Sequence, residues 1–210
     1  IDRFFLRAKD DADISADLTT GRLSIVHANF SDIGLVAEEA GLTSVDAIFA
    51  DLGYSSDQIE EGARGLSFSK DGPLDMRLDR SSGETAAHIV NVWGEDSLSD
   101  LFSEMGDEEC AKSIARAIVR TRKERAFTRT LELAEVVEQA MPMRVRSKRK
   151  THPATKVFQA LRIAVNDEYG NLERFLEQSV DLLVPNGRLG VISFHSGEDR
   201  IVKRFFRQMA

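Results

Sequence analysis

An acidic residue, Asp51, stands directly after residues 45–50, an apolar run that is typical of a buried strand. In an open α/β sheet, a polar side chain at the carboxyl end of a strand faces the ligand-binding edge. Gly53 then permits a sharp turn, and Ser55 supplies a hydroxyl. The pattern favours ligand binding or proton acceptance by Asp51 and Ser55, with capping of a following helix as the alternative.

A second polar group, residues 193–200, reads Ser-Phe-His-Ser-Gly-Glu-Asp-Arg and follows another apolar run. Ser196 is expected to be the N-cap of the next helix, with Asp199 near the positive end of its dipole. His195 belongs either to this helix start or to a substrate site, and we assign it to substrate binding.

Several other chemistries lack the residues they need. The four histidines are scattered, without a His-x-x-x-His pair, so no metal site is predicted. The sequence contains neither a phosphate-binding Gly-x-x-x-x-Gly-Lys-Ser/Thr loop nor the Gly-x-Ser-x-Gly elbow of α/β-hydrolases. The single cysteine, Cys110, excludes a disulfide framework and fits a reducing compartment, so we expect the cytoplasm.

A sheet is needed to bring these polar segments to one edge. Three apolar, β-branched runs have the length of strands: residues 23–27, 45–50 and 188–194. The last follows Pro185-Asn-Gly187, a turn signal, and a short helix is expected over residues 33–41 with Gly41 as its left-handed C-cap. Nearly continuous apolar runs are typical of a parallel sheet, which predicts an α/β fold.

Residues 84–166 read as almost entirely helical. Five apolar residues at helical spacing form one buried stripe: Ala111, Ile114, Ala115, Ile118 and Val119. Thr130 is expected to cap the next helix. By contrast, residues 64–79 alternate charged and apolar side chains and fit neither helix nor strand, which is typical of a loop that contacts a ligand.

The 210 residues carry a formal net charge of −7, which hides a strong asymmetry. Residues 112–156 hold 13 Lys/Arg and four Asp/Glu, a net charge of +9, so the rest of the chain carries −16. Arg116, Arg120 and Lys123 share one helical stripe, and Arg149 lies in the same basic segment. We assign these four to a polyanionic substrate, with a solvated helix face as the alternative.

The amino-acid composition excludes some classes of protein. With 42% apolar residues the chain can build a sizeable core and is not disordered. No apolar run approaches the roughly 20 residues that span a bilayer, so no membrane partner is expected. The sequence does not indicate the oligomeric state.

Five blocks of the sequence together resemble the RsmH (MraW) family of methyltransferases. They are residues 51–56 (DLGYSS), 64–68 (RGLSF), 71–79 (DGPLDMRLD), 152–163 (HPATKVFQALRI) and 187–203 (GRLGVISFHSGEDRIVK). The resemblance implies a class I (Rossmann-like) methyltransferase sheet with an inserted all-helical, RNA-binding domain. It also implies methyl transfer from S-adenosylmethionine to the N4 amine of a cytosine in small-subunit (16S) ribosomal RNA, free or in the assembled small ribosomal subunit, and thus a function in rRNA processing.

Carried over by position, the resemblance implies that Asp2, Phe30, Asp51 and Gln58 contact the cofactor. Asp2 would accept hydrogen bonds from the ribose, and Phe30 would pack near the adenine. Asp51 or Ser55 would orient the target amine. The domains would be residues 1–83 with 167–210 as the methyltransferase core and 84–166 as the inserted helical domain.

The family's glycine-rich first motif and its last two strands have no counterpart in this sequence, which predicts an incomplete sheet and a fragment of a longer chain. The alternative function is a truncated or degenerate, non-catalytic RNA- or ribosome-binding module. A methyltransferase for small molecules or proteins is a further rival, although the basic segment argues against a small molecule. Two residues also depart from the family pattern: Gly197 replaces a usual Leu, and Tyr54 a usual small aliphatic residue.

Overall fold

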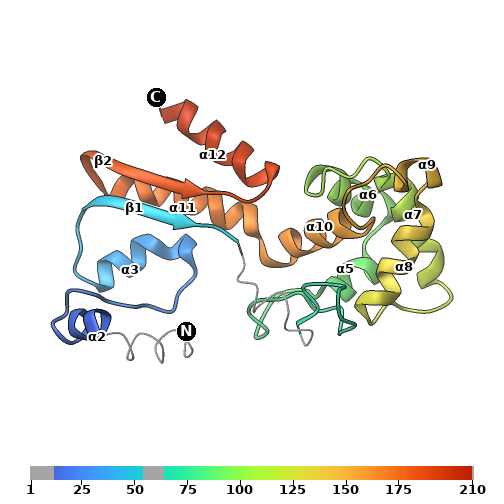
Figure 1. The fold of residues 1–210 in the computed structure, drawn as a ribbon, viewed down its shortest axis with the longest axis horizontal. Helices are drawn as coiled ribbons and strands as arrows, with labels where there is room; N and C mark the ends of the chain where they lie inside the picture. Colours follow the sequence, from blue (N-terminus) through green and yellow to red (C-terminus); the bar gives the residue numbers. More distant parts are fainter. Residues whose placement is uncertain (1–11, 54–63, 210) are drawn as a thin grey trace. The chain divides into compact units, whose positions relative to one another are not determined.

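The computed structural model describes residues 12–53 and 64–209, and the chain divides into two compact units (Figure 1). Unit 1 consists of residues 1–50 and 171–190, and unit 2 of residues 51–170 and 191–210. The described strands, β1 (Val45–Asp51) and β2 (Leu183–Ile192), pair as a two-stranded sheet and run in the same direction.

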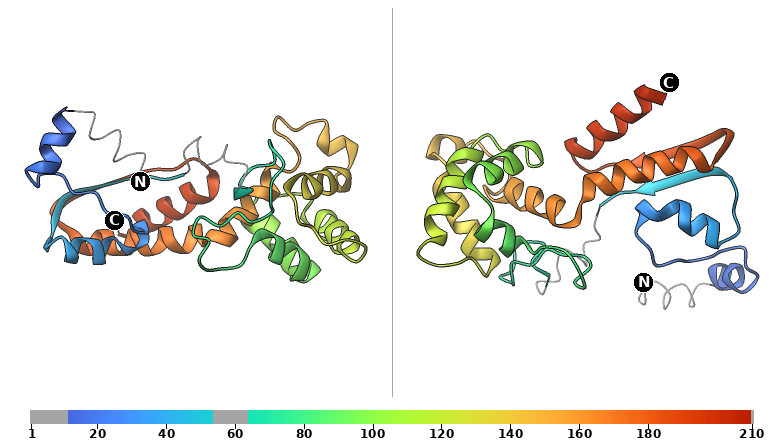
Figure 2. Two further views of the ribbon diagram at one scale, coloured as in Figure 1. Left: turned by 90° about the horizontal axis from the view of Figure 1, so that it is seen from below. Right: turned by 180° about the vertical axis from the view of Figure 1, so that it is seen from behind.

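Besides most of this sheet, unit 1 contains α2 (Ala12–Thr19), the 3-10 turn η1 (Phe30–Asp32), α3 (Ile33–Glu39) and most of α11 (Glu168–Leu182). Helix α11 lies along the strands in both Figure 1 and Figure 2. The side chain of Gln178 on α11 accepts a hydrogen bond from the Gly34 N–H at 2.9 Å and donates one to the Ser31 carbonyl at 2.7 Å. These two bonds fix the start of α3 on α11.

Helix α3 ends as the sequence predicted. Gly41 has a φ of +70°, and its N–H bonds to the Glu38 carbonyl while the Leu42 N–H bonds to the Ala37 carbonyl. This pair of bonds is the Schellman arrangement, which needs a residue that tolerates the left-handed region.

Two strand predictions are corrected. Residues 23–27 form no strand and are mostly exposed, because no described strand lies beside them to complete a hydrogen-bonded ladder. Strand β2 begins at Leu183 rather than Arg188, so the turn signal lies inside it. Asn186 adopts a φ of +69° there, which makes it a local irregularity in the strand rather than a chain reversal.

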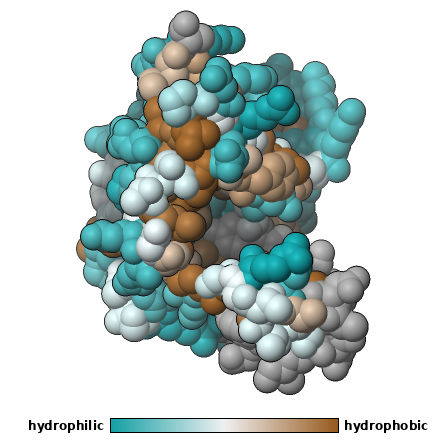
Figure 3. Space-filling model, turned by 90° about the vertical axis from the view of Figure 1, so that its left-hand side faces the viewer, coloured by the Kyte–Doolittle hydropathy of each residue, from teal (hydrophilic) through white to brown (hydrophobic). Residues whose placement is uncertain are grey.

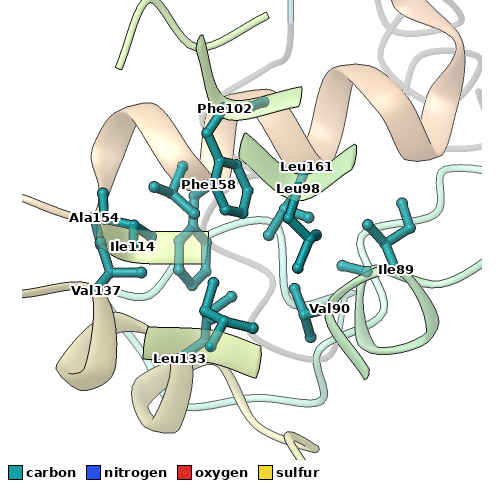
Figure 4. Packing of buried hydrophobic residues seen from close by; sticks show 14 of the residues in the cluster. Ile89, Val90, Leu98, Phe102, Ile114, Leu133, Val137, Ala154, Phe158 and Leu161 are labelled. Carbon is teal, nitrogen blue, oxygen red and sulfur yellow. The ribbon is translucent and has the colours of Figure 1, made fainter. Parts of the chain in front are cut away.

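Unit 2 is mainly helical, as predicted for residues 84–166. It contains α5 (Ala86–Val92), α6 (Glu95–Glu104), α7 (Ala111–Arg122), α8 (Thr130–Ala140), α9 (Met143–Arg146), α10 (Thr155–Asn166) and α12 (Ser196–Met209). Figure 4 shows the hydrophobic core of this unit, where Phe102 of α6, Ile114 of α7 and Leu133 of α8 pack with Phe158 of α10. The predicted apolar stripe of α7 is buried apart from Val119, which is half-buried.

Thr130 does not cap α8, contrary to the prediction. It is the first helical residue, and its hydroxyl accepts a hydrogen bond from the Gly72 N–H at 3.0 Å. The Glu132 carboxylate accepts from the Thr128 and Arg129 N–H groups just before the helix. The first two N–H groups of the helix, those of Thr130 and Leu131, bond to the Gly72 carbonyl and the Asp71 carboxylate.

The irregular segment 64–79 packs against these helices. Leu74 and Met76 are fully buried in the core, and the carbonyls of Leu74 and Asp75 accept from the first two N–H groups of α5. The segment is irregular, as predicted, but its apolar half serves packing, which the ligand-loop interpretation did not anticipate.

Apolar side chains also reach the surface, as the brown areas of Figure 3 show. In unit 1 Leu35, Leu42 and Phe49 are each at least half exposed. Among the described helices, none is long and apolar enough to cross a membrane.

Candidate functional site

The carboxyl ends of the two strands lie side by side in unit 2. The Leu52 N–H bonds to the Ile192 carbonyl at 3.1 Å, so the segment after β1 continues alongside the end of β2. Gly53 has a φ of +109°, and a Cβ there would lie 3.0 Å from the Phe194 ring. The absence of a side chain at Gly53 therefore lets the two segments approach, and the polar segments that begin at Asp51 and Ser193 meet.

Asp51 is the last residue of β1 and is exposed. Within the described part of the chain, its carboxylate has no hydrogen bond or ion pair. It is thus an available hydrogen-bond acceptor at the edge where open α/β sheets hold ligands. Ser55, Gln58 and Asp2 lie outside the described residues, and the functions assigned to them stay predictions.

Phe30 lies in unit 1, at the start of η1. Its ring meets that of Phe175 on α11 edge-on, with centroids 5.5 Å apart, and 42% of the residue is exposed. One part of the ring is thereby fixed by packing while another remains open, which is compatible with a contact to a planar aromatic ligand.

His195, rather than the predicted Ser196, occupies the N-cap position of α12. Its carbonyl accepts from the Asp199 N–H at 3.2 Å, and its Nδ1 accepts from the Glu198 N–H at 3.4 Å. Glu198 reaches back to accept from the Phe194 N–H at 2.9 Å, which makes a reciprocal cap. The hydroxyl of Ser196 points elsewhere and donates to Asp107.

The second ring nitrogen of His195 is turned inward as well. Nε2 is buried and lies 3.3 Å from Glu198 Oε1, without a hydrogen bond of good geometry. Both nitrogens therefore face Glu198, which gives His195 a structural function in the turn after β2. Its assignment to substrate binding stays a prediction.

Glu198 is the acid on which this turn depends. Burial would raise the pKa of its carboxyl, but the close approach of the His195 ring and the hydrogen bond from the Phe194 N–H, with the charge of nearby Arg162, hold the pKa below its ordinary value. The carboxylate form is thus stabilised in the fold.

Glu168 completes the one group of three metal-capable side chains that the described residues bring together; its ligand atoms and those of His195 and Glu198 lie within 4.8 Å of one another. Arg162, however, donates to both oxygens of Glu168, at 2.8 and 3.0 Å. Because this guanidinium already supplies a positive charge, we interpret the group as an ion-paired cluster.

Replacing Glu198 by Gln keeps an acceptor for the Phe194 N–H but removes the charge. We expect the free energy of unfolding at pH 7 to fall by about 1 kcal/mol. Since the folded pKa lies below the unfolded value near 4.5, the wild-type advantage is present above that pH and is lost as the pH falls through the folded pKa. Urea unfolding between pH 7 and pH 3, followed by the fluorescence of the single tryptophan, measures this. The exposed Glu109→Gln is the control, and a pH-independent difference for Glu198→Gln would contradict the expectation.

Arg149 has a buried partner that the sequence did not reveal. Its guanidinium pairs with Glu108, whose side chain is 0% exposed, while that of Arg149 is 13% exposed. Glu108 also accepts from the Cys110 N–H at 2.8 Å. The hydrogen bond to Glu108 raises the pKa of Arg149. The pair ties the segment after α9 to the segment before α7.

Arg149→Met would leave the Glu108 carboxylate buried without its counter-charge. We expect a loss of about 3–5 kcal/mol in the free energy of unfolding, measured by urea denaturation. Lys150→Met, at the exposed neighbouring position, is the matched control and should change stability by less than about 0.5 kcal/mol. Equal effects of the two substitutions would show that the pair is not a structural link.

The basic segment separates into paired and unpaired cations. Arg125, Arg129 and Arg146 form ion pairs with Glu132, Asp71 and Glu138, and Arg122 donates to the Val90 carbonyl. Arg116 has only an exposed contact, 3.4 Å from Glu95. Within the described residues, six side chains of the segment have no hydrogen bond or ion pair: Lys112, Arg120, Lys123, Arg144, Lys148 and Lys150.

Of the predicted substrate-binding residues, Arg116 and Arg120 are exposed on α7 and Lys123 is exposed at its C-cap, while their assignment to substrate binding stays a prediction. Lys112 completes their stripe, since it lies four residues before Arg116. We call these four residues the α7 basic stripe.

Comparison with known proteins places the chain among methyltransferases, and its small parallel sheet among helices is consistent with an incomplete methyltransferase fold. The model of the MraW methylase family matches residues 7–210, so the chain belongs to that family. A protein of Desulforapulum autotrophicum named Ribosomal RNA small subunit methyltransferase H is 51% identical over 187 residues, which are 89% of this chain and 60% of the relative.

A protein of the same name from Thermomicrobium roseum is 49% identical over 195 residues, covering 93% of this chain and 59% of the relative. The chain thus spans about three fifths of the length of these relatives.

Proposed function

We propose that this chain forms part of an S-adenosylmethionine-dependent methyltransferase that acts on the N4 amine of a cytosine in small-subunit ribosomal RNA. The observation that carries the proposal is that unit 2 holds both the strand-end carboxylate of Asp51 and the cations Lys112, Arg120 and Lys123 of the α7 basic stripe, none of which has a partner among the described residues. The names of the relatives, which are rRNA small-subunit methyltransferases, support it.

The finer architecture belongs to the same proposal. Residues 1–83 and 167–210 would form a class I methyltransferase core, and residues 84–166 an inserted helical domain that holds RNA. The substrate would be the RNA alone or the assembled small ribosomal subunit, in the cytoplasm.

S-adenosylmethionine, when bound, supplies a methyl group activated by a sulfonium. Asp51 fits its amine and hydroxyl donors, because its carboxylate lies at the strand end and has no partner in the part of the chain that the structure describes. Phe30 offers a partly exposed ring to the adenine. Asp2 and Gln58 would add polar contacts to the cofactor.

The chemistry needs a group that prepares the amine. The lone pair of cytosine N4 is delocalised into the ring, so N4 is a poor nucleophile. Asp51 or Ser55 would accept a hydrogen bond from an N4 hydrogen and favour the pyramidal form. Orientation of this kind lowers a barrier by up to about 7–11 kcal/mol in well-arranged reactions. Moving the base out of its stack costs a few kcal/mol.

Contacts with phosphates would offset this cost. Arg116, Arg120 and Lys123 would neutralise RNA phosphates, and the release of counterions makes such binding weaken with salt. Arg149, paired with Glu108, would act by holding the segment between α9 and α10 in place.

The test uses the protein as its gene encodes it, with S-adenosylmethionine and small-subunit ribosomal RNA. We expect N4-methylcytidine, detected by mass spectrometry of the RNA nucleosides. The triple variant Lys112→Gln, Arg120→Gln, Lys123→Gln should bind RNA more weakly and lower the slope of log affinity against log salt by about 2–3.

The control is Lys70→Gln with Arg207→Gln, which removes exposed cations of unit 2 outside the stripe. If no N4-methylcytidine forms, the proposed activity is wrong. If the salt slope of the triple variant equals that of the wild type, the α7 basic stripe is not the RNA-binding surface.

A further inference from the structure

The turn between α6 and α7 makes contacts with segments far away in the sequence. The two carboxylate oxygens of Asp107 have separate partners on α12: Oδ2 accepts from the Ser196 hydroxyl at 2.9 Å, and Oδ1 lies 3.5 Å from Arg200 Nη2. The Asp107 carbonyl accepts from the Lys156 ammonium group on α10. Asp107 adopts a φ of +50°, a left-handed conformation that aspartate tolerates better than most residues.

A second contact supports the same junction. The Tyr169 hydroxyl donates to the Met105 carbonyl at 3.4 Å, and burial raises the pKa of this phenol, which keeps it a donor. Gly197 in the first turn of α12 makes room for Tyr169, since a Cβ there would overlap the hydroxyl. The α6–α7 turn is therefore held against the start of both α11 and α12.

The segments on either side of this junction lead to two different parts of the proposed site, the α7 basic stripe and the strand ends. After the turn the chain enters α7 at Ala111, and α7 carries the basic stripe. Before α12 the chain leaves β2 through Phe194, whose ring packs over Gly53, two residues from Asp51. All of these residues belong to unit 2, so Asp107 connects the RNA-facing helix to the strand ends.

We propose that Asp107 is a positioning residue that fixes the segment 193–198 relative to α7 and so sets the rate of methyl transfer. The inference rests on the proposed function. The Asp107 carboxylate is well suited to this because the Ser196 hydroxyl, followed by the charges of Arg200 and Lys156, keeps its pKa low and its charge in place.

Stability and rate should respond differently to the loss of this link. The Arg200–Asp107 pair is 62% and 46% exposed, and exposed pairs contribute little to stability. A displacement of about 1 Å in an active site, by contrast, lowers a rate by as much as 100-fold. Removal of Asp107 should thus leave the fold intact and slow the chemistry.

The variants are Asp107→Ala and Asp107→Asn, made in the protein as its gene encodes it. We expect Asp107→Ala to lower kcat for RNA methylation at least 10-fold, with KM for RNA and for S-adenosylmethionine within twofold of wild type. Asp107→Asn should recover most of the rate, because its amide oxygen still accepts from Ser196. The control is Asp199→Asn, since the Lys203–Asp199 pair has the same exposures, 62% and 46%, but lies within one helix.

Amide hydrogen exchange at Glu198 and Asp199 gives a readout that does not need activity, and Asp107→Ala should accelerate it. Unchanged exchange, an unchanged kcat, or a change in KM as large as that in kcat would each overturn the proposal. A wild-type protein without methyl transfer would overturn the proposed function instead, while the exchange result would still decide whether Asp107 holds the segment.

Discussion

The close approach of backbone to backbone at Gly106 is the constraint on which the functional part of unit 2 depends. A Cβ at this position would lie 2.7 Å from the carbonyl oxygens of both Phe102 and Lys156, so the end of α6 meets α10 only because position 106 has no side chain. This contact determines where α7 begins and where Asp107 projects. Through Asp107 it also determines how α12, and with it the end of β2, is held.

Charge in unit 2 is used in two ways that the sequence does not distinguish. Some cations neutralise acids inside the fold: Arg149 pairs with the fully buried Glu108, and Arg162 with Glu168. Others, such as Arg120 and Lys123, have no partner within the described residues and remain available to a polyanion. Buried pairs define the geometry of the unit, whereas exposed cations contribute little to stability and are free to bind.

Regular periodicity made much of the fold predictable. The helices of residues 84–166, the Gly41 cap and strand β1 follow from local patterns, and so does the position of Asp51 at a strand end. The predictions that were wrong concern residues whose structure depends on contacts with segments distant in the sequence. Residues 23–27 have strand composition but no neighbouring strand among the described residues, the hydroxyl of Ser196 donates to Asp107, 89 residues away, instead of capping α12, and the burial of Arg149 requires Glu108, 41 residues away.

Gly106→Ala tests the central constraint most directly. The single tryptophan, Trp93, packs on the helical core of unit 2 and reports its unfolding in urea. We expect Gly106→Ala to lower the free energy of unfolding by about 1–3 kcal/mol, as overpacking does. The control is Gly94→Ala, where the Ser97 hydroxyl would lie 3.9 Å from the new Cβ; it should cost no more than a poor N-cap, about 0.5 kcal/mol. Equal stability of the two variants would contradict the account.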